Sequence, residues 1–213
     1  MLKPVSIVLP TYNERETIKL LIGEIAARIS PDSEIIVVDD ASPDGTGEIV
    51  DELAQKDSRV RLLSRRERGL TSALRAGIED AENDNVIWLD ADFAHPPEVI
   101  PELIEADETC DIVVASRYVR GGSDGRDSYL RRIASIALNR IGQWEVRSSV
   151  RDLSSGFVRA KKDILTELNF RGDYGDYCID FLVRAERSGC KIAEIPYTNS
   201  EREEGYSKTT ANP

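Results

Sequence analysis

Residues 86–92, Val-Ile-Trp-Leu-Asp-Ala-Asp, join a run of apolar side chains to two carboxylates that a single alanine separates. The apolar run predicts a short buried strand that ends at Leu89. Ligands of open α/β sheets bind beyond the carboxyl ends of the strands, so Asp90 and Asp92 are expected at a ligand site. Carboxylate oxygens suit Mg²⁺ or Mn²⁺, and such a cation would offset the charge of a diphosphate.

Strand-like and helical patterns alternate on both sides of this stretch. Apolar strands separated by crossover helices are typical of a parallel sheet that is buried on both faces. The pattern therefore predicts an α/β fold with a Rossmann-like, doubly wound, mostly parallel sheet flanked by helices. We expect strands at 5–9, 34–38, 60–63, 86–89 and 112–115, helices over about 14–29, 46–56 and 70–81, and a helix that opens at Pro96-Pro97.

The pattern changes after residue 116. A glycine-rich stretch at 121–125 precedes an apolar stripe with helical spacing across 130–141. Further on we expect a strand at 157–160, a helix at 176–187 and a strand at 191–195, followed by a polar loop or tail at 198–213. We interpret the chain as one domain, 1–213, in which residues 1–116 bind a nucleotide and residues 117–197 supply the other substrate site.

The charge distribution narrows the possible partners. The 213 residues include 28 basic and 39 acidic side chains, which gives a net charge of −11 and disfavours nucleic acid as a partner. Residues 117–151 are the exception, because they hold eight arginines against three acidic residues, a local charge of +5. This segment predicts an anionic partner.

Cysteine usage and hydropathy predict a cytoplasmic protein. The three cysteines are far apart and lack metal-ligand spacing, which favours a reducing compartment. A chain of this length needs neither disulfides nor a structural metal to be stable. No apolar run approaches the ~20 residues that span a bilayer, and the chain opens without a charged leader.

Residues 10–14, Pro-Thr-Tyr-Asn-Glu, follow the first expected strand. At this edge of the sheet, Tyr12 and Glu14 could hold a nucleotide base or ribose. The alternative is structural: Asn13 would cap the next helix, and Glu14 would favour its positive end. Both interpretations fit the sequence.

The second expected strand is followed by Asp39 and Asp40. Carboxylates placed directly after a buried strand lose hydration unless they are paired or bind something. A second-strand acid often contacts the nucleotide in such folds, so we place Asp40 on the ligand. Asp44-Gly45-Thr46 is interpreted as a turn and a helix start.

Together these motifs resemble those of inverting glycosyltransferases of the GT-A fold, and more narrowly those of polyprenyl-phosphate (dolichol-phosphate) mannose synthases. The resemblance runs from about residue 5 to residue 208. It rests on residues 42–46 (Ser-Pro-Asp-Gly-Thr), 90–92 with 95–98 (His-Pro-Pro-Glu), 116–118 with 121–122, 155–157, and Arg202 with 205–208 (Gly-Tyr-Ser-Lys).

The resemblance implies transfer of mannose from GDP-mannose to a polyprenyl (dolichyl) phosphate, giving a β-linked lipid-phospho-sugar with Mg²⁺ or Mn²⁺ as cofactor. It implies a nucleotide-sugar site made by Pro10, Tyr12, Glu14, Val38, Asp40, Asp90, Ala91, Asp92, Arg117, Arg202 and Lys208. It implies metal binding by Asp90 and Asp92, acceptor-phosphate binding by Arg117, Arg131 and Arg202, and catalytic roles for Asp92, Arg117 and Arg131. Where the family usually has a metal-binding Gln, this chain has Ala94, and water could take that place.

Several alternatives stay open at this level. The donor could be UDP-glucose, or the chain could be a noncatalytic nucleotide-sugar-binding subunit. His95, the only histidine, could act as a general base, although packing or capping is favoured. The stripe at 130–141 and Trp144 could face lipid or a core. A lipid acceptor would also require peripheral docking at the cytoplasmic face of a membrane, directly, through an anchoring subunit or through a further anchor.

Overall fold

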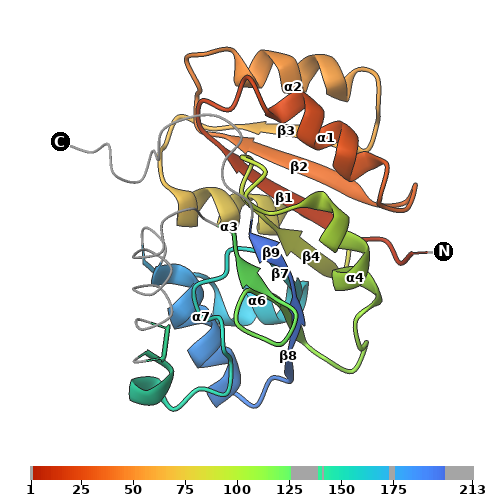
Figure 1. Cartoon of the computed structure of the whole chain (residues 1–213). Coiled ribbons are helices and arrows are strands. Elements are labelled where there is room, and N and C mark those ends of the chain that lie inside the picture. Colours follow the sequence, from red (N-terminus) through yellow and green to blue (C-terminus); the bar gives the residue numbers. More distant parts are fainter. Residues whose placement is uncertain (1, 126–138, 141, 173–175, 200–213) are drawn as a thin grey trace.

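A seven-stranded sheet with helices on both faces forms the body of the protein (Figure 1). The computed structural model describes residues 2–125, 139–140, 142–172 and 176–199. Its strands are β1 (Ser6–Thr11), β2 (Glu34–Asp39), β3 (Val60–Ser64), β4 (Asn85–Trp88), β5 (Ile112–Ser116), β6 (Ser123–Asp124), β7 (Val158–Lys161), β8 (Ile192–Pro196) and β9 (Thr198–Asn199). Its helices are α1 (Ile18–Ala26), α2 (Thr46–Ala54), α3 (Leu70–Asp80), the 3₁₀ turn η1 (Pro97–Val99), α4 (Ile100–Glu105), α6 (Lys162–Leu168) and α7 (Asp176–Arg187).

The strand order is β3-β2-β1-β4-β7-β5-β8, and β6 pairs with β9 in a separate small sheet. Within the large sheet, β7 runs antiparallel to β4 and β5, and the other pairings are parallel. The predicted fold class is therefore confirmed. The parallel strands β1, β2 and β4 end at one edge, which gathers the loops that follow them.

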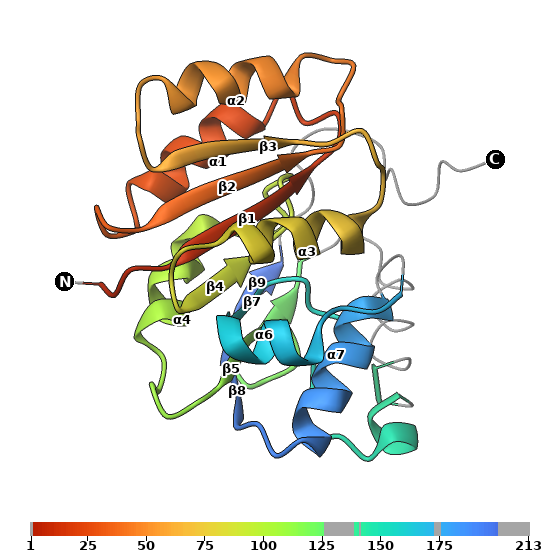
Figure 2. The same ribbon diagram turned by 180° about the vertical axis from the view of Figure 1, so that it is seen from behind.

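The core forms two layers because successive strand side chains point to opposite faces. Val8 and Trp88 pack on the face covered by α3, α6 and α7, which Figure 2 shows in front of the sheet. Leu9 and Leu89 pack on the other face, with α1, α2 and α4. Strands that are apolar at every position, as predicted here, are buried on both sides.

Three features differ from the expected elements. Helix α1 begins at Ile18 rather than near residue 14, and a hydrogen-bonded turn precedes it, in which the carbonyl of Glu14 accepts from the amides of Thr17 (3.2 Å) and Ile18 (2.9 Å). Residues 198–199 form β9 instead of belonging to a loop or tail. Helix α6 was not predicted, since seven residues are too few for a clear helical pattern. Most of the stripe at 130–141 lies outside the described residues.

Glu34, the first residue of β2, links this strand to three other segments of the chain. Its buried carboxylate accepts hydrogen bonds from the Ser6 hydroxyl (2.6 Å), the Glu82 amide (2.6 Å) and the Arg61 guanidinium (2.5 Å). Burial alone would raise the pKa of Glu34, but these hydrogen bonds outweigh it and hold the pKa below its ordinary value.

This depressed pKa predicts an acid-sensitive contribution to stability. The contribution is present above the pKa of glutamate in the unfolded chain, about 4.3, and is lost as the pH falls through the lower folded pKa. We therefore expect Glu34→Gln to reduce the dependence of the unfolding free energy on pH below that value, measured by urea denaturation across acidic pH. Glu52→Gln, at an exposed position on α2, is the control. If the unfolding free energy of Glu34→Gln depended on acidic pH as strongly as that of the unmodified chain, the assignment would be wrong.

Candidate active site

Three loops meet at the carboxyl edge of the sheet, after β1, β2 and β4. The Asn13 amide donates to the Ser42 hydroxyl (2.9 Å), and the Glu14 amide donates to the Thr46 hydroxyl (2.9 Å). The buried Thr17 hydroxyl donates to the Ala91 carbonyl (2.9 Å). These hydrogen bonds join the first loop to both of the others, so the three loops form one connected rim.

Each of these loops contains a residue with left-handed backbone geometry. The φ angle is 59° at Asn13, 51° at Ala41 and 60° at Phe93. Residues other than glycine rarely adopt such angles, and the strain persists only where surrounding contacts impose it. Strained backbone often occurs at binding and catalytic sites, so its presence in all three loops makes this edge the candidate functional site.

Asp44 anchors the loop after β2, as its interpretation as a turn and helix start predicted. Its carboxylate accepts hydrogen bonds from the Thr46 hydroxyl (2.6 Å), the Thr46 amide (3.0 Å) and the Arg15 amide (3.1 Å). Burial would raise the pKa of Asp44, but these hydrogen bonds lower it overall. This carboxylate therefore holds loops together rather than facing a ligand.

The Asp-Ala-Asp segment forms a tight turn directly after β4. The Asp90 amide donates to Nδ1 of His95 (3.0 Å), and the Asp92 carboxylate accepts from the Ala94 amide (3.0 Å). The Asp90 side chain is 44% exposed, whereas Asp92 as a residue is only 3% exposed. The turn thus places one accessible and one buried carboxylate at the edge where the sequence predicted a ligand.

His95 holds this turn in place through a hydrogen bond and ring contacts. It is 6% exposed, its ring stacks on Phe157 with centroids 5.3 Å apart, and it meets Tyr197 at 6.0 Å. Because Nδ1 accepts a hydrogen bond from the Asp90 amide, the N–H group of the ring belongs on Nε2 in this arrangement. These contacts fit the favoured packing and capping role.

The rim also includes a loop between β3 and α3, which the sequence reasoning missed. Asp40 is 6% exposed, accepts a hydrogen bond from the Gly69 amide (2.9 Å) and lies 3.1 Å from Nε of Arg65. Burial raises the pKa of Asp40 above its ordinary value. The Arg68 guanidinium covers the Tyr12 ring at 4.4 Å. In the sequence, the charged run Arg65-Arg66-Glu67-Arg68 was the feature that could have indicated this loop.

Arg117 lies in a buried ion pair. Asp152 is fully buried, and it accepts hydrogen bonds from Nε (2.8 Å) and Nη2 (2.7 Å) of Arg117 and from its amide (3.0 Å). Nη2 also donates to the Ser154 hydroxyl (2.8 Å). Burial would lower the pKa of Arg117, but Asp152 outweighs it and raises that pKa. Of the guanidinium nitrogens, Nη1 is the one outside these hydrogen bonds.

The remaining predicted residues divide into two groups. Pro10 and Val38 are partners in the register of β1 and β2, and Ala91 is buried with its carbonyl bound by Thr17. Glu14 begins the turn that leads into α1. Arg131, Arg202 and Lys208 lie outside the described residues.

Residues 6–168 match the family model of Glycosyl transferase family 2, and the chain belongs to that family. The resemblance to polyprenyl-phosphate mannose synthases is also confirmed, by curated relatives that carry such names.

Three of these relatives can be compared in detail. A dolichol-phosphate mannosyltransferase of Pyrococcus furiosus is 36% identical, over 96% of this chain and 58% of its own length. A polyprenol monophosphomannose synthase of Mycolicibacterium smegmatis is 34% identical, over 97% of this chain and 81% of its own length. An undecaprenyl-phosphate mannosyltransferase of Micrococcus luteus is 35% identical, over 94% of this chain and 85% of its own length. The chain thus spans less than two thirds of the first relative and most of the other two.

Solved structures support the fold. Glucosyl-3-phosphoglycerate synthase from Mycobacterium tuberculosis, in complex with UDP, has a TM-score of 0.72 at 24% identity, over 98% of this chain and 76% of that chain. A mannosyltransferase from Pyrobaculum calidifontis, in complex with GDP-Man and Mn²⁺, has a TM-score of 0.70 at 21% identity, over 97% of this chain and 59% of that chain. Both likenesses confirm the GT-A architecture. Within the described part of the chain, no helix combines the length and apolar character needed to cross a bilayer.

Proposed function

We propose that this chain transfers mannose from GDP-mannose to the phosphate of a polyprenyl (dolichyl) lipid, with inversion at the sugar carbon. The observation that carries the proposal is the Asp-Ala-Asp turn at the rim of a family 2 domain whose relatives, about 35% identical, are polyprenyl-phosphate mannosyltransferases. In this assignment the rim holds the donor, and the chain beyond β5 holds the acceptor.

The donor would lie across the three loops. We assign the nucleoside to Pro10, Tyr12, Glu14, Val38 and Asp40, and the diphosphate to Asp90, Ala91 and Asp92. This wall would combine the Asp40 carboxylate, which contacts Arg65, with the Tyr12 ring, which carries Arg68 on one face. A purine base has complementary features, a flat ring and N–H donors.

The carboxylates of Asp90 and Asp92 fit a divalent cation in chemistry. Mg²⁺ is commonly held by one or two carboxylates together with substrate phosphates and several waters. No group of three or more His, Cys, Asp or Glu side chains within the described residues is placed to hold a metal, so diphosphate oxygens and water would complete the coordination. Bound there, Mg²⁺ or Mn²⁺ would supply charge stabilisation of the leaving nucleoside diphosphate.

The acceptor can act as a nucleophile without a general base. A phosphate monoester carries about −1.5 to −2 charge at neutral pH. One of its oxygens would form a bond to the anomeric carbon of mannose while the bond from that carbon to the diphosphate oxygen breaks. We assign the grip on the acceptor phosphate to Arg117, through Nη1, and to Arg131 and Arg202, with Lys208 on the donor phosphates. Arginine forks bind such oxygens bidentately and fix their direction, whereas Nη1 of Arg117 would bind them without its fork partner Nη2, which donates to Asp152 and Ser154.

His95 is expected to position the metal-binding turn rather than to take a proton. His95→Phe keeps the ring stack on Phe157 but removes the acceptor for the Asp90 amide. We expect Mn²⁺ affinity and mannosyl transfer to fall roughly 10–100-fold, as for other residues that orient metal ligands. His95→Asn, whose side chain retains an acceptor, should lose less. Equal loss in both variants, or an unchanged Mn²⁺ affinity, would contradict this role.

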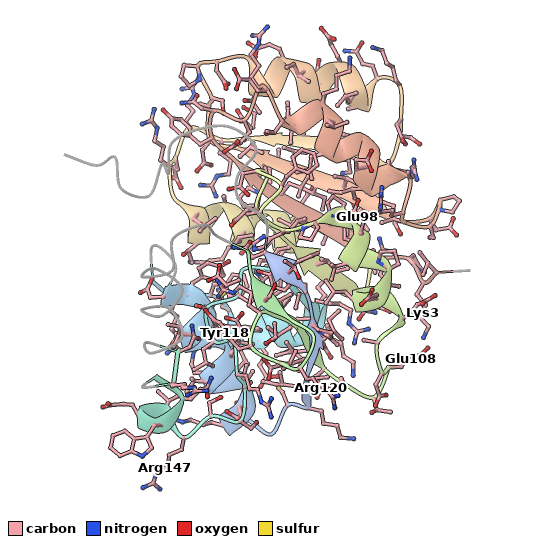
Figure 3. The ribbon with its side chains drawn as sticks, viewed as in Figure 1. Lys3, Glu98, Glu108, Tyr118, Arg120 and Arg147 are labelled. Carbon is pink, nitrogen blue, oxygen red and sulfur yellow. The ribbon has the colours of Figure 1, made fainter. Side chains whose placement is uncertain are left out.

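Trp144 is expected to help the protein dock on a bilayer. It is 82% exposed. Arg140 and Arg147, which lie close to it in the chain, are exposed as well, and Arg147 is a turn residue that Figure 3 labels at one end of the molecule. Indole rings prefer the membrane interface, and each arginine near an anionic surface contributes about 1 kcal/mol. These exposed side chains support the proposal that the protein docks peripherally at the cytoplasmic side of a membrane, with or without an anchoring subunit.

The corresponding prediction concerns liposome binding. We expect Trp144→Ala and Arg147→Glu each to weaken binding to anionic liposomes by about fivefold or more, and added salt to weaken binding of the unmodified chain. Leu20→Ala is the matched control, because Leu20 is also an exposed apolar residue (57%) but lies on α1. Sedimentation with liposomes measures the effect. Salt-independent binding, or an equal loss in the Leu20 variant, would contradict the assignment.

A donor panel tests the proposed function against its alternatives. Thermal unfolding with GDP or UDP in the presence of Mg²⁺ should show the larger stabilisation with GDP. Transfer to polyprenyl phosphate should then proceed from GDP-mannose in preference to UDP-glucose. Preference for UDP-glucose would favour the glucosyltransferase alternative. Nucleotide binding without transfer from either donor would favour a noncatalytic subunit.

A further inference from the structure

A hollow lies at the opposite edge of the sheet from the Asp-Ala-Asp turn. Its volume is about 410 Å³, and it is bordered by the residue that precedes β1 (Val5), the start of β4 (Asn85) and the end of β7 (Lys161). We call it the basal hollow. Lys3 and Glu108, labelled together in Figure 3, also line it. The mechanism proposed above uses none of these residues.

The basal hollow contains a buried arginine with poor hydrogen bonds. Arg159 is 5% exposed and lies on β7 opposite Ile87 and Val113, whose side chains pack on the α4 face. Within the described part of the chain, its guanidinium donates only at 3.4–3.5 Å, to the carbonyls of Ile104, Asp107 and Cys110. Its Nε is buried and makes no hydrogen bond. Ordinary N–H···O distances are about 2.7–3.2 Å, so most of its donor capacity is poorly used.

The charge of Arg159 is also weakly compensated. Among the described residues, no carboxylate oxygen lies within the 4.0 Å that defines an ion pair with this guanidinium. The neighbouring cations differ, since Lys161 pairs with Asp111 (2.7 Å) and Lys3 with Glu108 (2.7 Å). Burial lowers the pKa of Arg159, yet an arginine cannot give up its proton in a protein. A buried charge that is held only by carbonyl dipoles is costly, and an anion would relieve that cost.

We propose that the basal hollow binds a phosphate group, free or carried by a small metabolite, on Arg159. The space falls within the range of about 300–1,000 Å³ that is typical of small-molecule sites. Besides Arg159, its charged lining residues are Lys3, Lys161, Lys162, Asp84, Glu108 and Asp163. Lys3 and Lys161 have carboxylate partners, so Arg159 is the cation on which we place the phosphate. A guanidinium matches phosphate oxygens in a bidentate geometry. Because the hollow lies at the far edge of the sheet, its occupant would be separate from donor and acceptor.

Binding of inorganic phosphate and of glycerol phosphate tests the proposal. Thermal unfolding is followed at constant ionic strength, with GDP and Mg²⁺ present to occupy the donor rim. We expect binding to weaken roughly 10–100-fold in Arg159→Gln and a few-fold in Lys161→Gln, since bonds to a charged group are lost. Arg187→Gln, exposed on α7, is the matched control and should bind normally. Binding of glycerol phosphate but not of inorganic phosphate would identify a carried phosphate group.

A crystal soaked with selenate locates the site independently, even where Arg159→Gln fails to fold. The expected result is an anomalous peak within hydrogen-bond distance of the Arg159 guanidinium. Selenate peaks confined to the rim around Asp90, or equal phosphate binding by the Arg159, Lys161 and Arg187 variants, would overturn the proposal.

Discussion

Asp92→Asn is expected to lower kcat/KM for mannosyl transfer by about 1000-fold or more. Charge stabilisation by a bound cation is worth several kcal/mol, and each 1.36 kcal/mol is a factor of ten. Asparagine keeps an oxygen that can accept from the Ala94 amide, so the turn after β4 should be preserved. The substitution therefore removes the negative charge of residue 92 and should leave the fold intact.

Three measurements separate this effect from misfolding. Mannosyl transfer and Mn²⁺ binding should both be severely reduced, while the urea midpoint should change little. Asp51→Asn, an exposed aspartate on α2, is the control and should retain normal transfer. If Asp92→Asn kept more than a tenth of the activity, Asp92 would not hold a catalytic cation.

Asp152→Asn is expected to destabilise the protein by about 3–5 kcal/mol, because it leaves the Arg117 charge buried without its partner. The carboxylate that it replaces is 0% exposed and receives three hydrogen bonds from Arg117. This pair joins the end of β5 to the 150–155 segment. Urea denaturation measures the loss.

The exposed pair of Lys3 and Glu108 provides the comparison. Both side chains are more than half exposed, so Glu108→Gln should cost no more than about 1 kcal/mol. The double variant Arg117→Met/Asp152→Asn should be less destabilised than the sum of its single variants, since no unpaired charge remains. Additive losses in that cycle would show that the two side chains do not act as a pair.

The sequence predicted the elements whose pattern is local. The fully apolar strands, the change to polar residues after each of them, and the turn at Asp44 follow from hydropathy and turn chemistry. The antiparallel direction of β7 could not be predicted, because its Val-Arg-Ala-Lys alternation fits either direction. Likewise β9 has two residues, and only its pairing with β6 defines it.

The position of the candidate site at the rim could be predicted from the sequence, but the long-range contacts around it could not. Asp90 and Asp92 follow a strand directly, so their place was readable from the sequence. Arg117 and Asp152 are separated by 35 positions, and an arginine-rich segment did not reveal which guanidinium is held by a buried carboxylate. The Arg68–Tyr12 contact joins loops that are brought together only by the sheet order.

The most direct test of the proposed function is the transfer of radiolabelled mannose from GDP-mannose to polyprenyl phosphate, with Mg²⁺ or with a chelator. The proposal predicts label in the lipid extract as a β-linked phospho-mannose, formed with the metal and lost with the chelator. Label that stays in the aqueous nucleotide fraction under both conditions, with GDP-mannose bound but unconverted, would contradict it.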